Sequence, residues 1–240
     1  MNRRDRLIVG ALIGVLLGVG SCLAGFAQSA IVNAPSTTVV PARKLYFEMD
    51  FITNYAGQRD DAKFANYLPR AVVGIGYNIE VGANVSYTRI KGGAPVELQP
   101  NVKWQFYRNE TTGVSAAVGC IWFVPVTRRT GTNTFGQCYS LASKQFKGTH
   151  GARFTAGAYG LIGANDEQRT KAGAIVGYEQ PLSQKVQFIV DWASGENRFG
   201  YISPALNIVM PHNGSFSAGY AIANRRRGNN NLFVYYGTQF

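Results

Sequence analysis

Apolar and polar residues alternate along most of this 240-residue chain. Near the start of the regular pattern, Leu45, Phe47 and Met49 fall on one face of an extended segment, whereas Glu48 and Asp50 fall on the other. A period of two residues is the signature of a β-strand with one apolar face. The pattern predicts strands over residues 45–51, 73–77, 79–88, 98–106, 114–124, 138–146, 152–162, 171–179, 186–192, 199–210, 215–223 and 232–240.

The connections between these segments alternate in length. Polar loops over residues 56–67, 127–137, 163–170 and 224–231 alternate with tight turns. One such turn is Pro211-His212-Asn213-Gly214, where Asn-Gly tolerates the positive φ of a hairpin. Outer-membrane barrels combine short turns on one side with longer loops on the other. We therefore expect an all-β fold, a single transmembrane antiparallel β-barrel of about twelve strands, with ten or fourteen as alternatives; closure satisfies the backbone hydrogen bonds in lipid.

The first residues have the features of an export signal. Three arginines precede an apolar stretch, and small residues follow it, which predicts a signal peptide over 1–27. Two alternatives are lipidation at Cys22, within a loose lipobox, and an uncleaved anchor helix over 7–27. Residues 28–43 carry prolines and small polar residues, so we expect a flexible periplasmic lead-in, followed by the barrel over 44–240.

Composition agrees with an exported barrel. Charged residues make up only 15% of the chain and aromatic residues 12%, with 28 glycines, which suits strands that face lipid. The net charge of +11 would also fit a nucleic-acid-binding protein, but the basic residues are scattered, and the tight cluster 225–227 lies in a loop. We expect outer-membrane lipid and lipopolysaccharide as partners, and no nucleic acid.

Two cysteines remain if the signal is removed. Cys120 and Cys138 flank a polar loop, and a hairpin centred near Arg129 would place them opposite each other. An even pair in an oxidising compartment predicts a disulfide, with two unpaired thiols as the alternative.

If the apolar face meets lipid, the opposite face lines the lumen. The polar and charged candidates on that face are Glu48, Asp50, Arg70, Glu80, Lys103, Gln105, Arg153, Gln187 and Asp191. They fit either a solute path or a set of ion pairs that closes a narrow barrel. The inward glycines either leave an open lumen or accommodate aromatic rings; they are Gly74, Gly76, Gly82, Gly119, Gly157, Gly173, Gly177 and Gly219. The three tryptophans and the many tyrosines are interpreted as lipid-facing or interfacial girdle residues.

No pattern of catalytic residues is present. The two histidines, His150 and His212, fall in tight turns, and neither neighbours a serine in the way an outer-membrane hydrolase needs. Asp191 and Ser194 are interpreted as the end of a strand. The histidines and cysteines have no spacing of metal ligands, and no phosphate-binding loop occurs. We expect a protein that is not an enzyme, with no metal and no cofactor.

The last strand carries a recognisable ending. Residues 232–240 alternate and stop at Phe240, with Tyr236 in the same phase. This resembles outer-membrane barrels whose final strand is read by the barrel-assembly machinery, although Thr238 departs from the usual residue. More narrowly, residues 76–82 and 103–107 resemble the aromatic-hydrocarbon uptake barrels of the phenol-degradation MetA-pathway family.

These resemblances imply a bacterial outer-membrane location and assembly by that machinery. We expect a channel for passive passage of small solutes. The alternatives are a non-conducting structural or adhesion barrel and, third, a lipid-modifying outer-membrane enzyme.

Overall fold

The computed structural model describes residues 30–54, 63–127, 132–148, 150–225 and 230–240. The predicted signal peptide over 1–27, with Cys22, lies outside the described residues, as do most of the arginine cluster at 225–227 and the predicted hairpin centre at Arg129. None of the described residues belongs to a helix long and apolar enough to cross a membrane.

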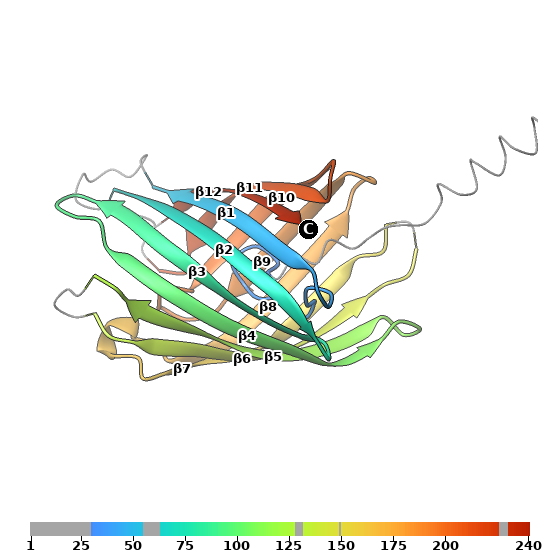
Figure 1. Cartoon of the computed structure of the whole chain (residues 1–240), viewed down its shortest axis with the longest axis horizontal. Coiled ribbons are helices and arrows are strands. Elements are labelled where there is room, and N and C mark those ends of the chain that lie inside the picture. The colour runs from blue at the N-terminus through green and yellow to red at the C-terminus, as the bar shows by residue number, and fades with distance from the viewer. Residues whose placement is uncertain (1–29, 55–62, 128–131, 149, 226–229) are drawn as a thin grey trace, which may run out of the picture.

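Within the described residues, twelve strands form one closed barrel (Figure 1). They are β1 (Leu45–Thr53), β2 (Phe64–Gly76), β3 (Ile79–Ile90), β4 (Val96–Asn109), β5 (Val114–Pro125), β6 (Phe135–Gln145), β7 (Arg153–Ile162), β8 (Ala172–Pro181), β9 (Val186–Ala193), β10 (Tyr201–Met210), β11 (Gly214–Ala223) and β12 (Asn231–Gln239). A single turn of 3₁₀ helix, η2 (Asp166–Gln168), lies between β7 and β8. Each strand pairs antiparallel with its neighbours in sequence, and β1 pairs with β12 to close the ring. The predicted fold is confirmed.

The seam between first and last strands is fully paired. Eight residue pairs join β1 to β12, from Tyr46 opposite Gln239 to Thr53 opposite Leu232. Beyond them, the N–H of Leu45 donates to the carbonyl of Phe240, and the N–H of Phe240 donates back to Leu45. The terminal residue therefore takes part in closing the barrel.

The connections at one end of the barrel are shorter on average than those at the other end. One end, here called the turn end, carries Phe240 and the connections 77–78, 110–113, 146–152, 182–185 and 211–213. The opposite, loop end carries the connections 54–63, 91–95, 126–134, 163–171, 194–200 and 224–230. The hairpin at 211–213 forms, but its positive φ values fall on His212 and Asn213, one residue earlier than Asn-Gly predicted, because Gly214 already belongs to β11.

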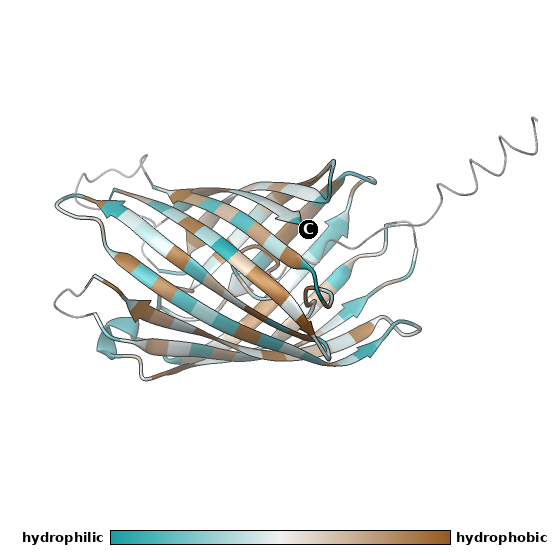
Figure 2. Ribbon diagram, in the orientation of Figure 1, coloured by the Kyte–Doolittle hydropathy of each residue, from teal (hydrophilic) through white to brown (hydrophobic). Residues whose placement is uncertain are grey.

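Hydrophobic and hydrophilic residues alternate along the strands (Figure 2), and large apolar side chains are exposed on the outer face, as the alternation predicted. Phe47 is 39% exposed and Trp104 49%, whereas Glu48 between the outward side chains of β1 is 4% exposed. Apolar side chains are exposed on every side of the closed barrel. Such a surface is in a favourable environment only when it meets lipid. Two strands begin earlier than predicted, since residues 64–67 belong to β2 and residues 135–137 to β6.

The predicted disulfide is present between Cys120 and Cys138. The two residues are directly opposite each other on β5 and β6. Their neighbours Gly119 and Tyr139 belong to the inward phase, so the bridge lies on the outer face of the barrel wall.

The tyrosine girdle prediction is wrong for five described residues, one of which, Tyr201, points into the lumen and lines its cavity. The other four, Tyr46, Tyr139, Tyr159 and Tyr235, are buried inside the barrel. The inward glycines explain how they fit: a Cβ on Gly119 would lie 2.4 Å from the Tyr139 hydroxyl. A Cβ on Gly173 would likewise meet the ring of Tyr159, and a Cβ on Gly219 would meet the ring of Phe233. In each pair the glycine lies directly opposite the aromatic residue on the neighbouring strand. At these positions the glycines accommodate rings and do not widen the lumen.

Candidate functional site

The lumen holds a segment of the chain itself. Residues 30–40, which we call the inner segment, precede β1 and fold back into the barrel. In Figure 1 part of this segment is seen inside the barrel, near the labels of β8 and β9. Ile31, Val32, Ser36, Thr37 and Val40 are each at most 2% exposed. The expectation of a flexible lead-in over 28–43 is therefore wrong for this part: small side chains let the segment fit, and polar groups of the wall hold it.

The tip of the inner segment is bound by one carboxylate. Backbone N–H groups of Val32, Asn33 and Ala34 all donate to Oδ2 of Asp191, at 3.0, 2.7 and 2.6 Å. Successive N–H groups that converge on one point form a concave site for an anion. The tip can do so because it turns sharply, with Ala30 bridged to Pro35. Asp191 is thus a buried charge compensated by backbone dipoles.

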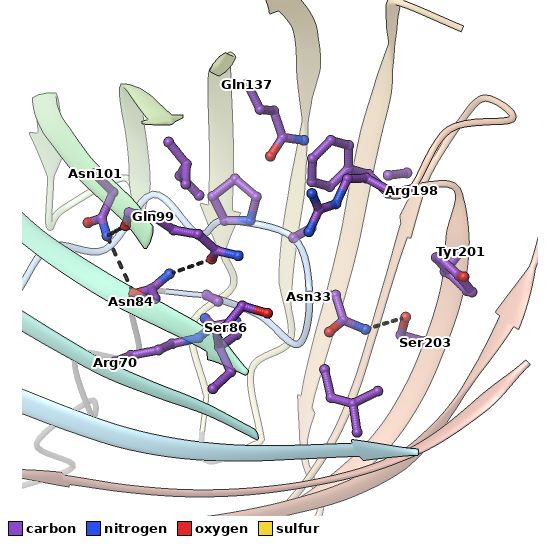
Figure 3. Close-up of a pocket in the computed structure, with 18 of the residues that line it drawn as sticks. Asn33, Arg70, Asn84, Ser86, Gln99, Asn101, Gln137, Arg198, Tyr201 and Ser203 are labelled. Atoms are coloured by element: carbon purple, nitrogen blue, oxygen red, sulfur yellow. Dashed lines mark hydrogen bonds between the residues drawn. The ribbon is translucent and has the colours of Figure 1, made fainter. Parts of the chain in front are cut away.

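The side chain of Asn33 ties the tip to two further strands. Its Nδ2 donates to the Ser203 hydroxyl at 2.9 Å (Figure 3). Its Oδ1 accepts from the Tyr235 hydroxyl at 2.5 Å. The tip therefore contacts β9, β10 and β12 at once.

The middle of the inner segment is held by hydroxyl groups. Oγ1 of Thr37 lies 2.8 Å from the Ser115 hydroxyl and 2.6 Å from the Ser143 hydroxyl. The Arg153 guanidinium donates to Thr37 and Thr38, at 2.6 and 2.8 Å. The amide of Gln105 donates to the Thr37 carbonyl at 2.7 Å. Two residues predicted to line the lumen, Arg153 and Gln105, therefore bind the inner segment.

The base of the segment meets a buried ion pair. Nζ of Lys103 lies 2.9 Å from Oε1 of Glu80, and both side chains are almost fully buried. The second carboxylate oxygen of Glu80 accepts the backbone N–H of Val40 at 2.7 Å. Val40 also packs with Tyr46 and Val72 in a small buried cluster. These contacts close the lumen on this side near the turn end.

A second charged group lies on β1 and β2. Arg70 pairs with Asp50 at 2.7 Å and with Glu48 at 3.5 Å, and Glu48 accepts the Tyr46 hydroxyl at 2.6 Å. Burying carboxylates is costly unless they are paired, and here the two carboxylates share the single positive charge of Arg70. The remaining predicted residue, Gln187, accepts from the side chain of Asn207 at 3.1 Å.

A cavity of about 340 Å³ lies in the lumen beside the inner segment. Its wall on β2, β3 and β4 is polar, with Asn66, Asn84, Ser86, Gln99 and Asn101 joined partly by hydrogen bonds (Figure 3). The inner segment supplies Asn33, Ala34 and Pro35 to its lining. Of the predicted lumen residues, Glu48, Arg70, Glu80 and Asp191 line this cavity.

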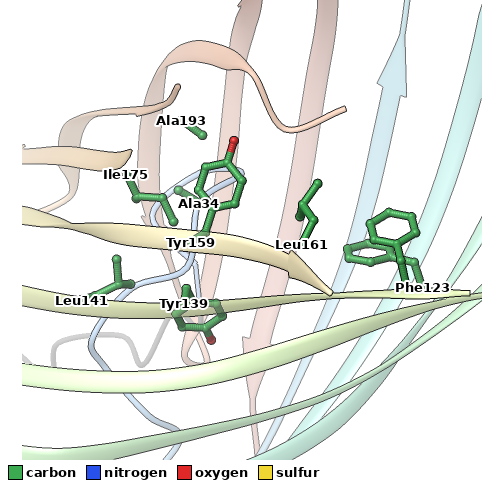
Figure 4. Close-up of a cluster of buried hydrophobic side chains, with 9 residues drawn as sticks. Ala34, Phe123, Tyr139, Leu141, Tyr159, Leu161, Ile175 and Ala193 are labelled. Atoms are coloured by element: carbon green, nitrogen blue, oxygen red, sulfur yellow. The ribbon is translucent and has the colours of Figure 1, made fainter. Parts of the chain in front are cut away.

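The opposite wall of the cavity is apolar. Phe123, Phe135, Tyr139, Leu141, Tyr159, Leu161 and Ile175 form one buried cluster with Ala34 of the inner segment (Figure 4). Phe123 and Phe135 stack with ring centroids 4.9 Å apart, and Phe199 from the β9–β10 connection joins them at 5.3 Å from Phe123. Alternation did not predict this inward aromatic group, because β6 reverses the usual phase: its large apolar side chains, such as Phe135 and Leu141, point inward, and small or polar residues point outward.

Potential metal ligands do not gather among the residues that the structure describes. No group of three histidine, cysteine, aspartate or glutamate side chains comes close enough to hold a metal ion in those ranges. His150 and His212 lie in the connections 146–152 and 211–213 at the turn end.

The barrel resembles one solved outer-membrane channel. No family model matches the chain, and no curated protein matches its sequence. An outer membrane channel from Pseudomonas putida F1 superposes with a TM-score of 0.54 at 10% identity, covering 84% of this chain and 97% of that one. A second structure, from work on in-meso crystallization of membrane proteins, reaches a TM-score of 0.48 at 10% identity, covering 82% and 83%. The similarity shows the fold of this chain.

Proposed function

We propose that this protein is an outer-membrane channel for passive passage of small solutes. The observation that carries the proposal is the cavity of about 340 Å³, with one polar and one apolar wall, inside a closed, externally apolar barrel. The similar barrel from Pseudomonas putida F1 is described as a channel, which supports the same assignment here. The turn end would face the periplasm and the loop end the outside, as in other bacterial barrels.

Passage would require movement of the inner segment. The cavity reaches from the loop end past the tip of the segment, but Val40, Tyr46 and Val72 pack together near the turn end. The structure therefore corresponds to a closed or narrow state, and conduction would depend on release of residues 30–40. The narrower resemblance to aromatic-hydrocarbon uptake barrels makes small aromatic compounds the first solutes to test.

Reconstitution into planar bilayers and liposomes tests the proposal. We expect stepwise currents from the refolded protein and swelling of liposomes in small solutes. Two neighbouring residues on β3 provide matched variants, because Ser86 lines the cavity and Val85 is exposed on the outer face. Ser86→Trp should lower the conductance, and Val85→Trp should leave it unchanged.

A silent protein would contradict the channel proposal. An absence of current from correctly folded protein, identified by its anomalous gel migration before heating, would favour the non-conducting structural barrel. The buried pair of Glu80 with Lys103 is the observation that favours this second candidate, because an ion pair between β3 and β4 stiffens the interior of the barrel.

A further inference from the structure

The connection between β9 and β10 folds inward across the loop end. Nδ2 of Asn197 donates to the Tyr159 hydroxyl and to the carbonyl of Thr170, both at 2.7 Å. Phe199, two residues further on, packs into the buried aromatic cluster. These anchors hold the intervening side chain, Arg198, at the entrance of the cavity, where it is part of the lining (Figure 3).

Arg198 reaches a strand far from its own position in the ring. Its Nη1 and Nη2 donate to the two carboxylate oxygens of Glu97 on β4, at 2.9 and 3.0 Å. Four strands, β5 to β8, separate β4 from β9 along the shorter way round the barrel. Among the described residues, the ion pair therefore lies across the entrance, so a solute that enters the cavity from the loop end comes close to it.

The aromatic cluster fixes the position of the guanidinium. Cζ of Arg198 lies 4.6 Å from the ring centre of Phe123 and 5.8–5.9 Å from those of Phe135 and Phe199. Contact with a ring face stabilises a cation by about 0.5–2 kcal/mol. Gln99 donates to Oε1 of Glu97 at 2.8 Å, which orients the carboxylate as well. Both partners are thus held in place.

From this arrangement we infer that Arg198 and Glu97 set the charge preference of the channel at its entrance. The inference rests on the proposed function. The other charged residues that line the cavity, Glu48, Arg70, Glu80 and Asp191, are on strands and engaged deeper in the lumen. At the entrance the pair is neutral as a whole, so removal of one partner leaves a single uncompensated charge of known sign.

Charge removal in both directions tests the inference. One unit charge about 7 Å from a passing ion, in a medium between water and protein in dielectric constant, changes the local concentration of that ion several-fold. Because cations and anions respond in opposite directions, the cation-to-anion permeability ratio should change by roughly tenfold. Arg198→Ala should raise the ratio, because Glu97 remains, and Glu97→Gln should lower it. Arg198→Lys should keep the wild-type ratio. The reversal potential in a potassium chloride gradient gives the ratio.

A neighbouring arginine provides the control. Arg169 is paired with Glu196 at the loop end, 49% exposed and outside the cavity lining. Arg169→Ala removes the same charge from the rim and should change the ratio less than twofold. If Arg198→Ala and Glu97→Gln change the ratio in the same direction, or leave it unchanged while the wild type conducts, the inference is wrong and the channel proposal stands.

A second measurement applies if the wild type is silent, which would contradict the proposed function. The variant Ser86→Cys places a thiol in the cavity wall, and its labelling from the loop end needs no conduction. Cationic and anionic thiosulfonate reagents of similar size are compared. Arg198→Ala should raise the cationic-to-anionic rate ratio and Glu97→Gln should lower it; equal ratios in all variants would overturn the inference.

Discussion

Replacing Asp191 should release the tip of the inner segment. Its Oδ2 accepts three backbone N–H groups, of Val32, Asn33 and Ala34. A hydrogen bond to a charged group contributes about 1.5–3 kcal/mol, but three donors on one oxygen do not contribute independently. Taking roughly 3 kcal/mol for the whole interaction, Asp191→Ala should raise the population of released segments by about 100-fold. Asp191→Asn should have a smaller effect, because the amide oxygen still accepts while the charge is lost.

Cysteine labelling measures this release directly. Ser36, inside the segment, is 2% exposed, so Ser36→Cys should react with maleimide slowly in the otherwise unchanged protein. Adding Asp191→Ala should accelerate the reaction by about the same factor as the population of the released state. Asp166→Ala is the control, because that carboxylate is fully exposed beside Lys171. Equal labelling rates with and without Asp191 would refute the assignment of this carboxylate as the anchor of the tip.

Three further predictions follow from contacts inside the barrel and at its seam. A Cβ on Gly177 would lie 2.2 Å from Cδ1 of Ile31, so Gly177→Val should displace the inner segment and raise conductance, and adding Ile31→Ala should reverse the effect. Lys103→Met should lower the free energy of unfolding in urea by about 3–5 kcal/mol, because it leaves Glu80 buried without its cation, and the double variant with Glu80→Gln should recover much of the loss. Deletion of Phe240 should reduce the yield of heat-modifiable barrel in cells but not refolding into detergent, if the residue acts through the assembly machinery; equal yields in cells would contradict that role.

The barrel itself could be predicted because lipid imposes a simple rule on each strand. Phe47 faces the acyl chains and Glu48 faces the lumen, so the two side chains differ in exposure. The sequence shows the same contrast as an apolar residue followed directly by a charged one. The disulfide was predictable for the same reason, since hairpin pairing places Cys120 opposite Cys138. Local periodicity determines both features.

The contents of the lumen could not be predicted in this way. The tip of the inner segment binds Asp191 through backbone N–H groups, which every non-proline residue carries, so no side-chain pattern marks it. Arg198 and Glu97 are 101 residues apart, and only closure of the ring brings them together. One feature of the sequence was consistent with this position: Ala34, Pro35 and Ser36 are small. A segment that lies inside a narrow barrel without strand pairing needs small side chains to fit.

The contact between Asn33 and Tyr235 has a consequence for biogenesis. These residues are 202 positions apart, near opposite ends of the polypeptide. The tip of the inner segment leaves the ribosome early, yet its docking surface is incomplete until β12 has been made and joined to β1. Docking of the inner segment is thus a late step of assembly. A newly closed barrel would have an unfilled lumen until residues 30–40 enter it.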